Sequence, residues 1–207
     1  MNKNLIIVFV RTPELGKVKT RLAKSIGDVS ALTIYKLLLK HTATVLHDLS
    51  FDKVVYYSEK VEENDFWEAR LFEKKLQKGA DLGERMQHAF ETAFEQGYQK
   101  VLIIGSDLFD LKSIHITTAF EALENHDLTI GPSLDGGYYL LGMKELYPAV
   151  FKNKKWGTDS ILENTLKDLQ QQNVKLLEAL NDIDTFEDLQ QQQPDLLKKI
   201  EDYDAPN

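Results

Sequence analysis

Residues 5–10 read LIIVFV, an unbroken apolar run in which most side chains are β-branched. Such a short, continuous run is typical of a strand that is buried on both faces, as in the centre of a parallel sheet. Residues 101–105, VLIIG, repeat the pattern further along the chain. Shorter runs at residues 54–57 and 128–130 predict two more strands. We therefore expect a mostly parallel sheet with the first run as a central strand.

Segments with apolar residues at helical spacing separate these strands. The sequence predicts helices at residues 29–48, at 82–96, after Ser113 and at 159–171. Asp28 and Ser113 are placed to cap two of these helices, and Gly97 is placed to end another. Because strands alternate with helices along most of the chain, the expected fold class is α/β.

Further segments complete the expected order. Residues 138–143 predict a small antiparallel element because two glycines precede them, and residues 174–180 predict the final strand. Residues 62–78 are ambiguous, and we expect a helix there followed by a short strand near Leu76. From about residue 185 the chain reads as an acidic helical tail. No linker or repeat interrupts residues 1–207, which are expected to form one domain.

The composition is that of an ordinary globular protein, with 207 residues, a mass of 23.7 kDa, 43% hydrophobic residues and 28% charged residues. A formal net charge of -8 argues against binding to nucleic acid or to an anionic membrane surface. The absence of cysteine excludes disulfides, thiolate zinc sites and a cysteine nucleophile. The first apolar run is too short for a signal peptide or a membrane span, so a cytoplasmic protein is expected.

The acidity is concentrated near the end of the chain. Residues 178–204 contain nine acidic and two basic residues, and so contribute -7 of the total charge of -8. Residues 11–24 contain five basic residues and one acidic residue, a local charge of +4. The region after the first strand is therefore basic, as an anionic ligand requires.

The loop after the first strand, residues 11–22, reads RTPELGKVKTRL. Ligands of open α/β sheets bind beyond the carboxyl ends of the strands, and cations in that position bind phosphate strongly. Gly16 also lets the backbone approach a ligand closely. A solvated amphipathic loop with scattered lysines explains the spacing equally well, and the sequence matches neither the P-loop nor the dinucleotide-binding glycine pattern.

Carboxylates follow two other predicted strands. Asp107 and Asp110 come just after residues 101–105, and Asp182 and Asp184 come just after the final strand. Such groups suit Mg²⁺ or Mn²⁺, which prefer oxygen ligands. Taken alone, each carboxylate is more simply explained as a helix cap or part of an Asx turn.

Residues 131–142, GPSLDGGYYLLG, combine a carboxylate, glycines and two tyrosines. Asp135 and the glycines that follow it are typical of a hairpin turn between two strands. The same residues suit a ligand site, in which the glycines allow close approach and the tyrosine rings cover the ligand. Residues 155–160, KWGTDS, are equally compatible with a helix cap.

Taken in order, these stretches resemble a known family. The motifs are RTPxxGxxKTRL at residues 11–22, QxGxDLGERM at 77–86, GxD at 105–107, GPxxDGGYY at 131–139, WGTD at 156–159 and DxDT at 182–185. They are similar to those of a bacterial glycosyltransferase-like family in the nucleotide-diphospho-sugar transferase superfamily, some members of which are described as arsenosugar-biosynthesis glycosyltransferases. More distantly, they resemble 2-phospholactate guanylyltransferases and molybdenum-cofactor nucleotidyltransferases. The resemblance spans about residues 5–190.

The resemblance implies a GT-A-type, Rossmann-like fold that binds a nucleotide against the N-terminal half of the sheet. It implies nucleotide-binding roles for Arg11, Gly16, Lys19, Arg21, Asp81 and Arg85. It implies Mg²⁺ or Mn²⁺ as the cofactor, with Asp107 and Asp184 as ligands, and catalytic roles for Asp107 and Asp135. The acceptor side is expected to include Gly136, Gly137, Tyr138, Trp156 and Asp159.

The chain also departs from the patterns of its relatives. Phe109 stands where the family usually has a proline, two residues after the first aspartate. The Asp-x-Asp of many metal-dependent glycosyltransferases is absent, as is the double-glycine first loop of sugar-phosphate nucleotidyltransferases.

Three functions remain open on this basis. The leading hypothesis is a metal-dependent glycosyltransferase that moves a sugar from a nucleotide-sugar to a small acceptor. The second is a nucleotidyltransferase that joins an NTP to a small phosphorylated acceptor. The third is a nucleotide-binding module without catalysis. The motifs specify neither the base, the sugar and the acceptor nor the oligomeric state.

Overall fold

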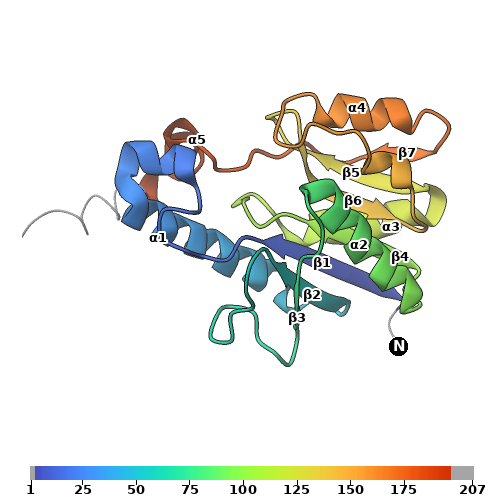
Figure 1. Ribbon diagram of the computed structural model, residues 1–207, viewed down its shortest axis with the longest axis horizontal. Helices are drawn as coiled ribbons and strands as arrows, with labels where there is room; N and C mark the ends of the chain where they lie inside the picture. The colour runs from blue at the N-terminus through green and yellow to red at the C-terminus, as the bar shows by residue number, and fades with distance from the viewer. Residues whose placement is uncertain (1–2, 197–207) are drawn as a thin grey trace, which may run out of the picture.

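A seven-stranded sheet runs through the middle of the molecule (Figure 1). This computed structural model describes residues 3–196. The strands are β1 (Asn4–Val10), β2 (Asp52–Tyr57), β3 (Glu73–Leu76), β4 (Lys100–Ile104), β5 (Leu128–Pro132), β6 (Tyr138–Met143) and β7 (Val174–Leu176). Their order across the sheet is β3-β2-β1-β4-β6-β5-β7, and β6 alone runs antiparallel to both of its neighbours. The expected mostly parallel sheet with an antiparallel element at residues 138–143 is therefore confirmed.

Helices cover both faces of the sheet (Figure 1). They are α1 (Thr20–His47), α2 (Leu82–Glu95), α3 (Ser113–Asn125), α4 (Ile161–Asp168) and α5 (Phe186–Gln192), with a short 3₁₀ helix, η1 (Pro148–Val150). The apolar faces of α1 and α3 pack on one side of the sheet, and those of α2 and α4 pack on the other. In the described part of the chain, no helix combines the length and the apolar character that crossing a membrane requires.

The strand β1 explains why residues 5–10 are apolar without interruption. It pairs with β2 on one side and with β4 on the other. Ile6 and Val8 point into the core beneath α1 and α3, whereas Leu5 and Ile7 point into the core beneath α2. Each such side chain stabilises the fold by about 1.5–3 kcal/mol when it is fully buried. Both faces of β1 therefore require apolar residues.

Two expected helix starts differ from the structure. The helix α1 begins at Thr20 instead of residue 29, but it is broken at Gly27, where φ is 80° and ψ is 160°. The segment after the break corresponds to the predicted helix, whereas the helical turns before Gly27 were not expected. The helix α3 begins at Ser113 itself, and Lys112, not Ser113, is its N-cap.

The ambiguous segment at residues 62–78 is only partly as expected. Its second half contains β3, the short strand predicted near Leu76. Its first half forms turns instead of a helix, so that expectation is wrong. The helix predicted at residues 159–171 and the strand predicted at 174–180 are both present but shorter, as α4 and β7. Of the tail predicted from about residue 185, α5 is helical, and the part beyond residue 196 lies outside the described residues.

Candidate functional site

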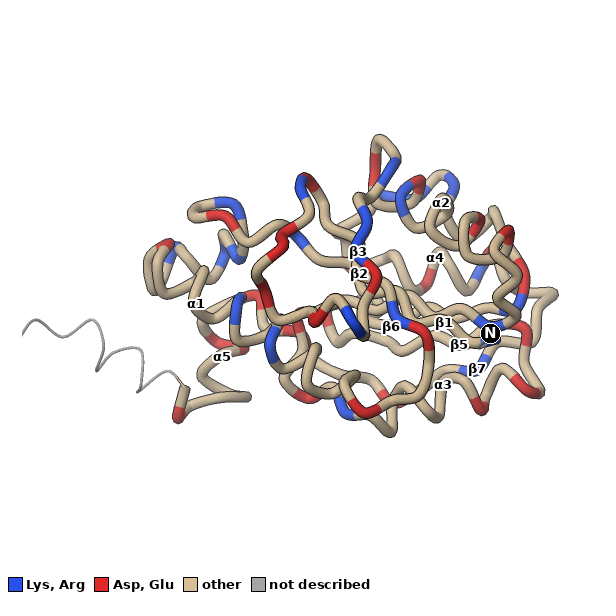
Figure 2. The backbone as a smooth tube through the Cα atoms, turned by 90° about the horizontal axis from the view of Figure 1, so that it is seen from below, with Lys and Arg blue, Asp and Glu red and all other residues tan. Residues whose placement is uncertain are grey.

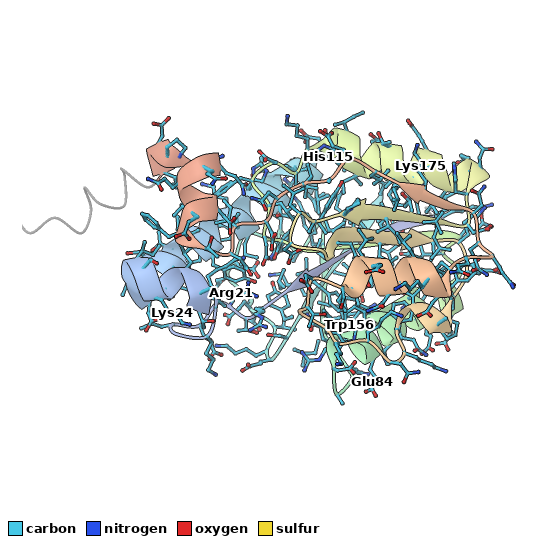
Figure 3. All side chains as sticks on the ribbon, turned by 90° about the horizontal axis from the view of Figure 1, so that it is seen from above. Arg21, Lys24, Glu84, His115, Trp156 and Lys175 are labelled. Carbon is cyan, nitrogen blue, oxygen red and sulfur yellow. The ribbon has the colours of Figure 1, made fainter. Side chains whose placement is uncertain are left out.

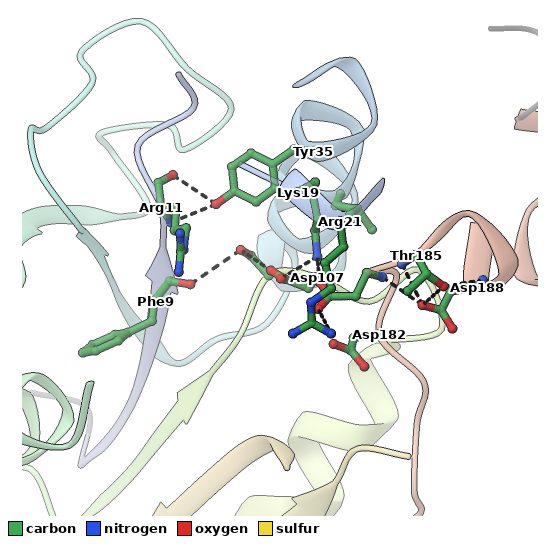
Figure 4. Close-up of polar contacts among 12 residues, drawn as sticks. Phe9, Arg11, Lys19, Arg21, Tyr35, Asp107, Asp182, Thr185 and Asp188 are labelled. Carbon is green, nitrogen blue, oxygen red and sulfur yellow. Dashed lines mark hydrogen bonds and ion pairs between the residues drawn. The ribbon is translucent and has the colours of Figure 1, made fainter. Parts of the chain in front are cut away.

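The strand order reverses between β1 and β4, and this reversal places a crevice at the carboxyl edge of the sheet. The chain moves from β1 outward to β2 and β3, and then returns to place β4 on the other side of β1. In open α/β sheets such a reversal is where ligands bind. The loop after β1, residues 11–19, and the loop after β4, residues 105–112, meet at this edge (Figure 4).

The basic loop after β1 is fixed by hydrogen bonds from neighbouring elements. The backbone N–H of Arg11 donates to the Tyr35 hydroxyl at 2.8 Å, and that hydroxyl donates back to the Arg11 carbonyl at 3.0 Å. The N–H of Thr12 donates to Ser58 Oγ at 3.0 Å, and the Thr12 hydroxyl donates to the Lys60 carbonyl at 3.2 Å. The loop, whose Lys and Arg positions are blue in Figure 2, is therefore anchored to α1 and to the segment after β2.

Lys19 ends this loop and places its ammonium between two carboxylates. Its backbone is left-handed, with φ 47° and ψ 43°, which is uncommon for a residue other than glycine. Its Nζ lies 2.7 Å from Asp107 Oδ2 and 3.0 Å from Asp184 Oδ1, and only 3% of its side chain is exposed (Figure 4). Gly16, which has a φ of 73°, makes the other left-handed turn of the loop.

The carboxylates and the ammonium stabilise one another in their charged forms. Burial disfavours the charge on Lys19, but Asp107 and Asp184 outweigh that effect, so the pKa of Lys19 is raised. Burial likewise favours the neutral form of Asp107, but Lys19 outweighs it and the pKa of Asp107 is lowered. Arg21 adds an ion pair from Nη1 to Asp184 Oδ2 at 3.4 Å, while most of its own side chain stays exposed.

Two more carboxylates face this centre. The pKa of Asp182 is raised to about 6, mainly by burial and then by the charges of Asp135 and Asp184. The segment that carries Asp182 and Asp184 is attached to the loop after β4 because the Ile183 N–H donates to the Asp107 carbonyl at 3.1 Å. The centre therefore combines acidic side chains with the buried ammonium of Lys19 and the guanidinium of Arg21.

The donor set fits the metal that the sequence predicts. Asp107 and Asp184 each place an oxygen within 3.0 Å of the same nitrogen, Lys19 Nζ, so their carboxylates converge on one small space. Mg²⁺ commonly uses one or two carboxylates together with phosphate oxygens. In the described part of the chain no three His, Cys, Asp or Glu side chains converge as a ready metal cluster. Metal binding at this pair stays a prediction.

The departure at Phe109 leaves these contacts in place. Its ring packs near His41, with ring centroids 5.6 Å apart, among the apolar side chains that join the start of α1 to α5. Asp107 retains its contacts with Lys19 and with the backbone of Ile183. The aromatic residue is therefore partly buried against an apolar cluster two residues beyond the aspartate.

Asp81 and Arg85 make internal hydrogen bonds at the start of α2. Asp81 caps α2 by accepting from the Glu84 N–H at 2.9 Å. Arg85 donates to the Gly79 carbonyl at 3.1 Å and to Gln77 Oε1 at 3.3 Å. The side-chain amide of Gln77 donates in turn to backbone carbonyls near the ends of β1 and β2. These side chains fix the start of α2 against the sheet edge, and a nucleotide-binding role for them stays a prediction.

Most residues of the predicted acceptor side line one cavity of about 190 Å³. They are Gly137, Tyr138 and Trp156, and the last of these lies beside the start of α2 (Figure 3). Asp135, which was predicted as a catalytic residue, lines the same cavity. The Tyr138 hydroxyl and the Trp156 indole nitrogen are buried and have no hydrogen-bond partner among the described residues. The cavity opens at the same sheet edge as the charged centre, because Gly105 also lines it.

The other two predicted acceptor residues do not line this cavity but are neighbours in sequence of residues that do. Gly136 has a φ of 88°, and a Cβ on it would lie 2.0 Å from the Asp159 carbonyl oxygen. The Gly136 carbonyl also accepts from the Leu162 N–H at 3.0 Å. Gly136 and Asp159 therefore pack against each other and hold the loop before β6 on the start of α4. Asp135 is fixed by accepting from the Gly137 N–H at 2.9 Å.

Several residues of the site carried no distinctive sequence signal. Tyr35, which holds the basic loop, sits at a helical position that reads as core. Ser106, which is buried and donates to Asp107, and Phe9, which lines the cavity, also read as ordinary strand-end residues. Asp182 was visible in the DxDT motif, but its position opposite Asp135 required the fold.

Comparisons with known proteins identify the family of the chain. Residues 41–158 match the family described as "Uncharacterized protein conserved in bacteria (DUF2064)". A 2-phospho-L-lactate guanylyltransferase from Methanocaldococcus jannaschii is 28% identical over 138 residues, which are 66% of this chain. The match spans 59% of that enzyme's own length.

Solved structures share the fold. A protein from Desulfovibrio desulfuricans G20, assigned as a nucleotide-diphospho-sugar transferase, is similar over 100% of both chains, with a TM-score of 0.87 and 32% identity. A cytidylyltransferase from Leptospira borgpetersenii covers 98% of this chain and 95% of its own, with a TM-score of 0.59 and 14% identity, and so shows the fold alone. The chain belongs to the DUF2064 family, within the nucleotide-diphospho-sugar transferase superfamily, and is by that kinship a transferase.

Proposed function

We propose that this protein transfers a glycosyl group from a nucleotide-sugar to a small acceptor, with Mg²⁺ or Mn²⁺ as cofactor. The observation that carries the proposal is the position of the Asp107–Lys19–Asp184 cluster. It lies at the strand reversal, where the basic loop after β1 and the cavity beside Asp135 meet. A diphosphate at this point has cations on one side and an acceptor cavity on the other.

The basic loop supplies the groups that bind the diphosphate. Arg21 is largely exposed and holds Asp184 at 3.4 Å, so it can turn to a phosphate without leaving a buried charge. Lys19 occupies the space between the two carboxylates, and its ammonium has to move when a divalent cation takes that space. A bound diphosphate gives the displaced ammonium a new anionic partner. Arg11 is placed by its backbone contacts with Tyr35 at the same edge.

The transfer itself requires a base and a stabilised leaving group. An acceptor hydroxyl attacks the anomeric carbon, its proton passes to the Asp135 carboxylate, and the bond to the nucleoside diphosphate breaks with the electron pair leaving on the phosphate oxygen. A divalent cation held by Asp107 and Asp184 would neutralise the charge that develops on that oxygen. Arg11, Lys19 and Arg21 add further positive charge around the leaving diphosphate.

Thermal unfolding with nucleotides tests the proposal. A ligand at 100 times its Kd stabilises a protein by about 2.7 kcal/mol, which raises Tm by roughly 5–10 °C in a chain of this size. We expect UDP- or GDP-sugars to produce such a shift with Mn²⁺ and not without it, and mass spectrometry to detect transfer to an acceptor. Asp107→Asn should abolish the shift, whereas Asp110→Asn, an exposed neighbour, should retain it. If no nucleotide stabilises the protein with or without metal, the proposal is wrong.

A second candidate function is nucleotidyl transfer, and the match to the guanylyltransferase favours it. In that reaction a phosphate of the acceptor is already nucleophilic, so no base is needed. Asp135→Asn separates the two functions. A glycosyltransferase that uses this base should lose ~10²–10⁴-fold in kcat, whereas a nucleotidyltransferase should lose mainly acceptor affinity. A metal-independent shift with GTP or CTP would support the second function.

A further inference from the structure

We propose that the cavity beside Asp135 binds an uncharged or cationic ring of the acceptor and excludes an anionic one. That the ring belongs to an acceptor rests on the function proposed above. The preference for a ring, and for one without negative charge, is argued from the cavity alone. The cavity lies between the carboxyl end of β4, the start of β6, the first turns of α2 and the segment before α4.

The walls of the cavity are apolar and largely aromatic. Phe9, Tyr138 and Trp156 contribute rings, and Leu82 and Met86 contribute aliphatic surface. The volume of about 190 Å³ exceeds the ~150 Å³ of an engineered apolar cavity that holds benzene. The space therefore accommodates one six-membered ring with a small substituent.

Gly105 extends this space toward the charged centre. A Cβ added to Gly105 would meet no atom within 4 Å, and its backbone does not need a glycine. Gly105 is two residues before Asp107, which holds Lys19. Gly105 therefore marks the side of the cavity that is nearest in sequence to the charged centre.

The formal charge on the cavity lining is negative. Asp135 is the only charged residue among the described residues that line it, and no Lys, Arg or His does so. The basic residues Arg21 and Lys24 lie on α1, well apart from Trp156 (Figure 3). An anionic group in this cavity would lose water, find no cation and face the Asp135 carboxylate. A neutral group avoids the repulsion, and a cationic group pairs with Asp135.

Three probes that share one ring separate these cases: benzyl alcohol, benzylamine and benzyl phosphate. Binding is measured on the full chain by saturation-transfer NMR and by the fluorescence of Trp156, with Trp156→Phe to assign the signal. The other tryptophan, Trp67, packs in the core on the opposite face of the sheet. We expect Kd values on the order of 1 mM for benzyl alcohol and benzylamine, as for small fragments in apolar pockets. Benzyl phosphate should bind at least about tenfold more weakly.

Variants place the binding in this cavity. Gly105→Val fills the open space and should abolish binding of all three probes, with folding checked by circular dichroism. Leu82→Phe, at a partly exposed wall position, is a second blocking variant that does not disturb the core. Asp135→Asn should remove any preference for benzylamine over benzyl alcohol.

The outcomes distinguish this inference from the proposed function. Binding of benzyl phosphate as tight as that of benzyl alcohol, or unchanged probe binding in both blocking variants, would overturn the inference. If nucleotides stabilise the protein and none of the probes binds, the inference fails while the proposed function stands. If the probes bind as expected and no nucleotide does, the ring-binding cavity stands and the transferase proposal fails.

Discussion

At the scale of single residues, Lys19 connects segments that are far apart in sequence, and its ammonium contacts Asp107 and Asp184 with almost no exposure to solvent. Removing the charge by Lys19→Met leaves two convergent carboxylates with no cation between them. Because both carboxylates are partly exposed, we expect a loss of about 1–3 kcal/mol in the free energy of unfolding at pH 7.5. Urea denaturation in the presence of a chelator measures this loss of stability.

The matched control is Lys17→Met. Lys17 pairs with Glu14 on the same loop, but its side chain is 58% exposed. Exposed pairs contribute little, so this variant should leave the midpoint of urea unfolding nearly unchanged. Equal effects of the two substitutions would show that the burial of Lys19 has no energetic importance.

Asp182 gives a pH-dependent prediction. Its pKa in the folded protein is about 6, which is above its value in an unfolded chain, so the folded state binds the proton more tightly. Its contribution to stability is therefore present at low pH and is lost as the pH rises through about 4 to 6. In the presence of a chelator, Asp182→Asn should stabilise the protein by on the order of 1 kcal/mol at pH 7.5 and by much less at pH 4.5. An equal gain at both pH values would contradict the assignment of the effect to this carboxyl group.

The sequence identified many residues of the site but not their contacts. Lys19, Asp107 and Asp184 follow a predicted strand or belong to a motif, so each could be chosen as a candidate. Their separations of 88 and 165 residues carry no periodic signal, and only the fold shows that one ammonium lies between the two carboxylates. The functional roles of these residues stay predictions, although their proximity is now a property of the structure.

At the scale of elements, continuous apolar runs gave the strands, and segments stabilised by distant contacts were misread. The turns before Gly27 are helical because Leu22 and Ile26 pack against α5, which lies far along the sequence. The segment before β3 forms turns because Asp65 accepts from the Trp67 N–H at 2.9 Å and pairs with Lys74 at 2.8 Å. The contacts with α5 join residues that no local pattern connects, and the pairing of Asp65 with Lys74 spans nine residues of irregular chain.

The break in α1 yields a prediction about backbone conformation. Gly27 has a φ of 80° and a ψ of 160°, a combination that side chains with a Cβ rarely adopt. No atom lies within 4 Å of a Cβ placed there, so Gly27→Ala changes only the backbone preference. We expect a loss of about 1–3 kcal/mol in stability. The control is Gly105→Ala, where φ is ordinary and space is open, and where stability should be unchanged or rise by about 0.4–1 kcal/mol. If Gly27→Ala left the free energy of unfolding unchanged, the break in α1 would not depend on glycine at this position.

At the scale of the whole molecule, a protein with a net charge of -8 carries a basic loop where its ligand is proposed to bind (Figure 2). Salt screens such a local field with a Debye length of ~10 Å at 0.1 M. Raising NaCl from 0.05 to 0.5 M should therefore weaken nucleotide-diphosphate binding about tenfold, as measured by calorimetry.

A pair of lysines tests whether this field is local. Lys24, on the first turns of α1, and Lys175, on β7, lie at opposite ends of the molecule (Figure 3). Each substitution to alanine lowers the net charge equally. Lys24→Ala should weaken nucleotide binding about twofold and flatten its salt dependence, whereas Lys175→Ala should leave both unchanged. Equal effects would mean that the net charge, and not its distribution, controls binding.

The contacts of Lys19 also set an order for biosynthesis. Its partners lie 88 and 165 residues further along the chain, so a growing polypeptide emerges from the ribosome with its cationic loop long before either aspartate has been made. The strand β1 likewise cannot pair with β4, one of its two neighbours, until β4 has been made. The charged centre is therefore completed only after residue 184 has been translated. A product that terminates before residue 184 retains the cations but lacks one of the two counter-charges between which Lys19 lies.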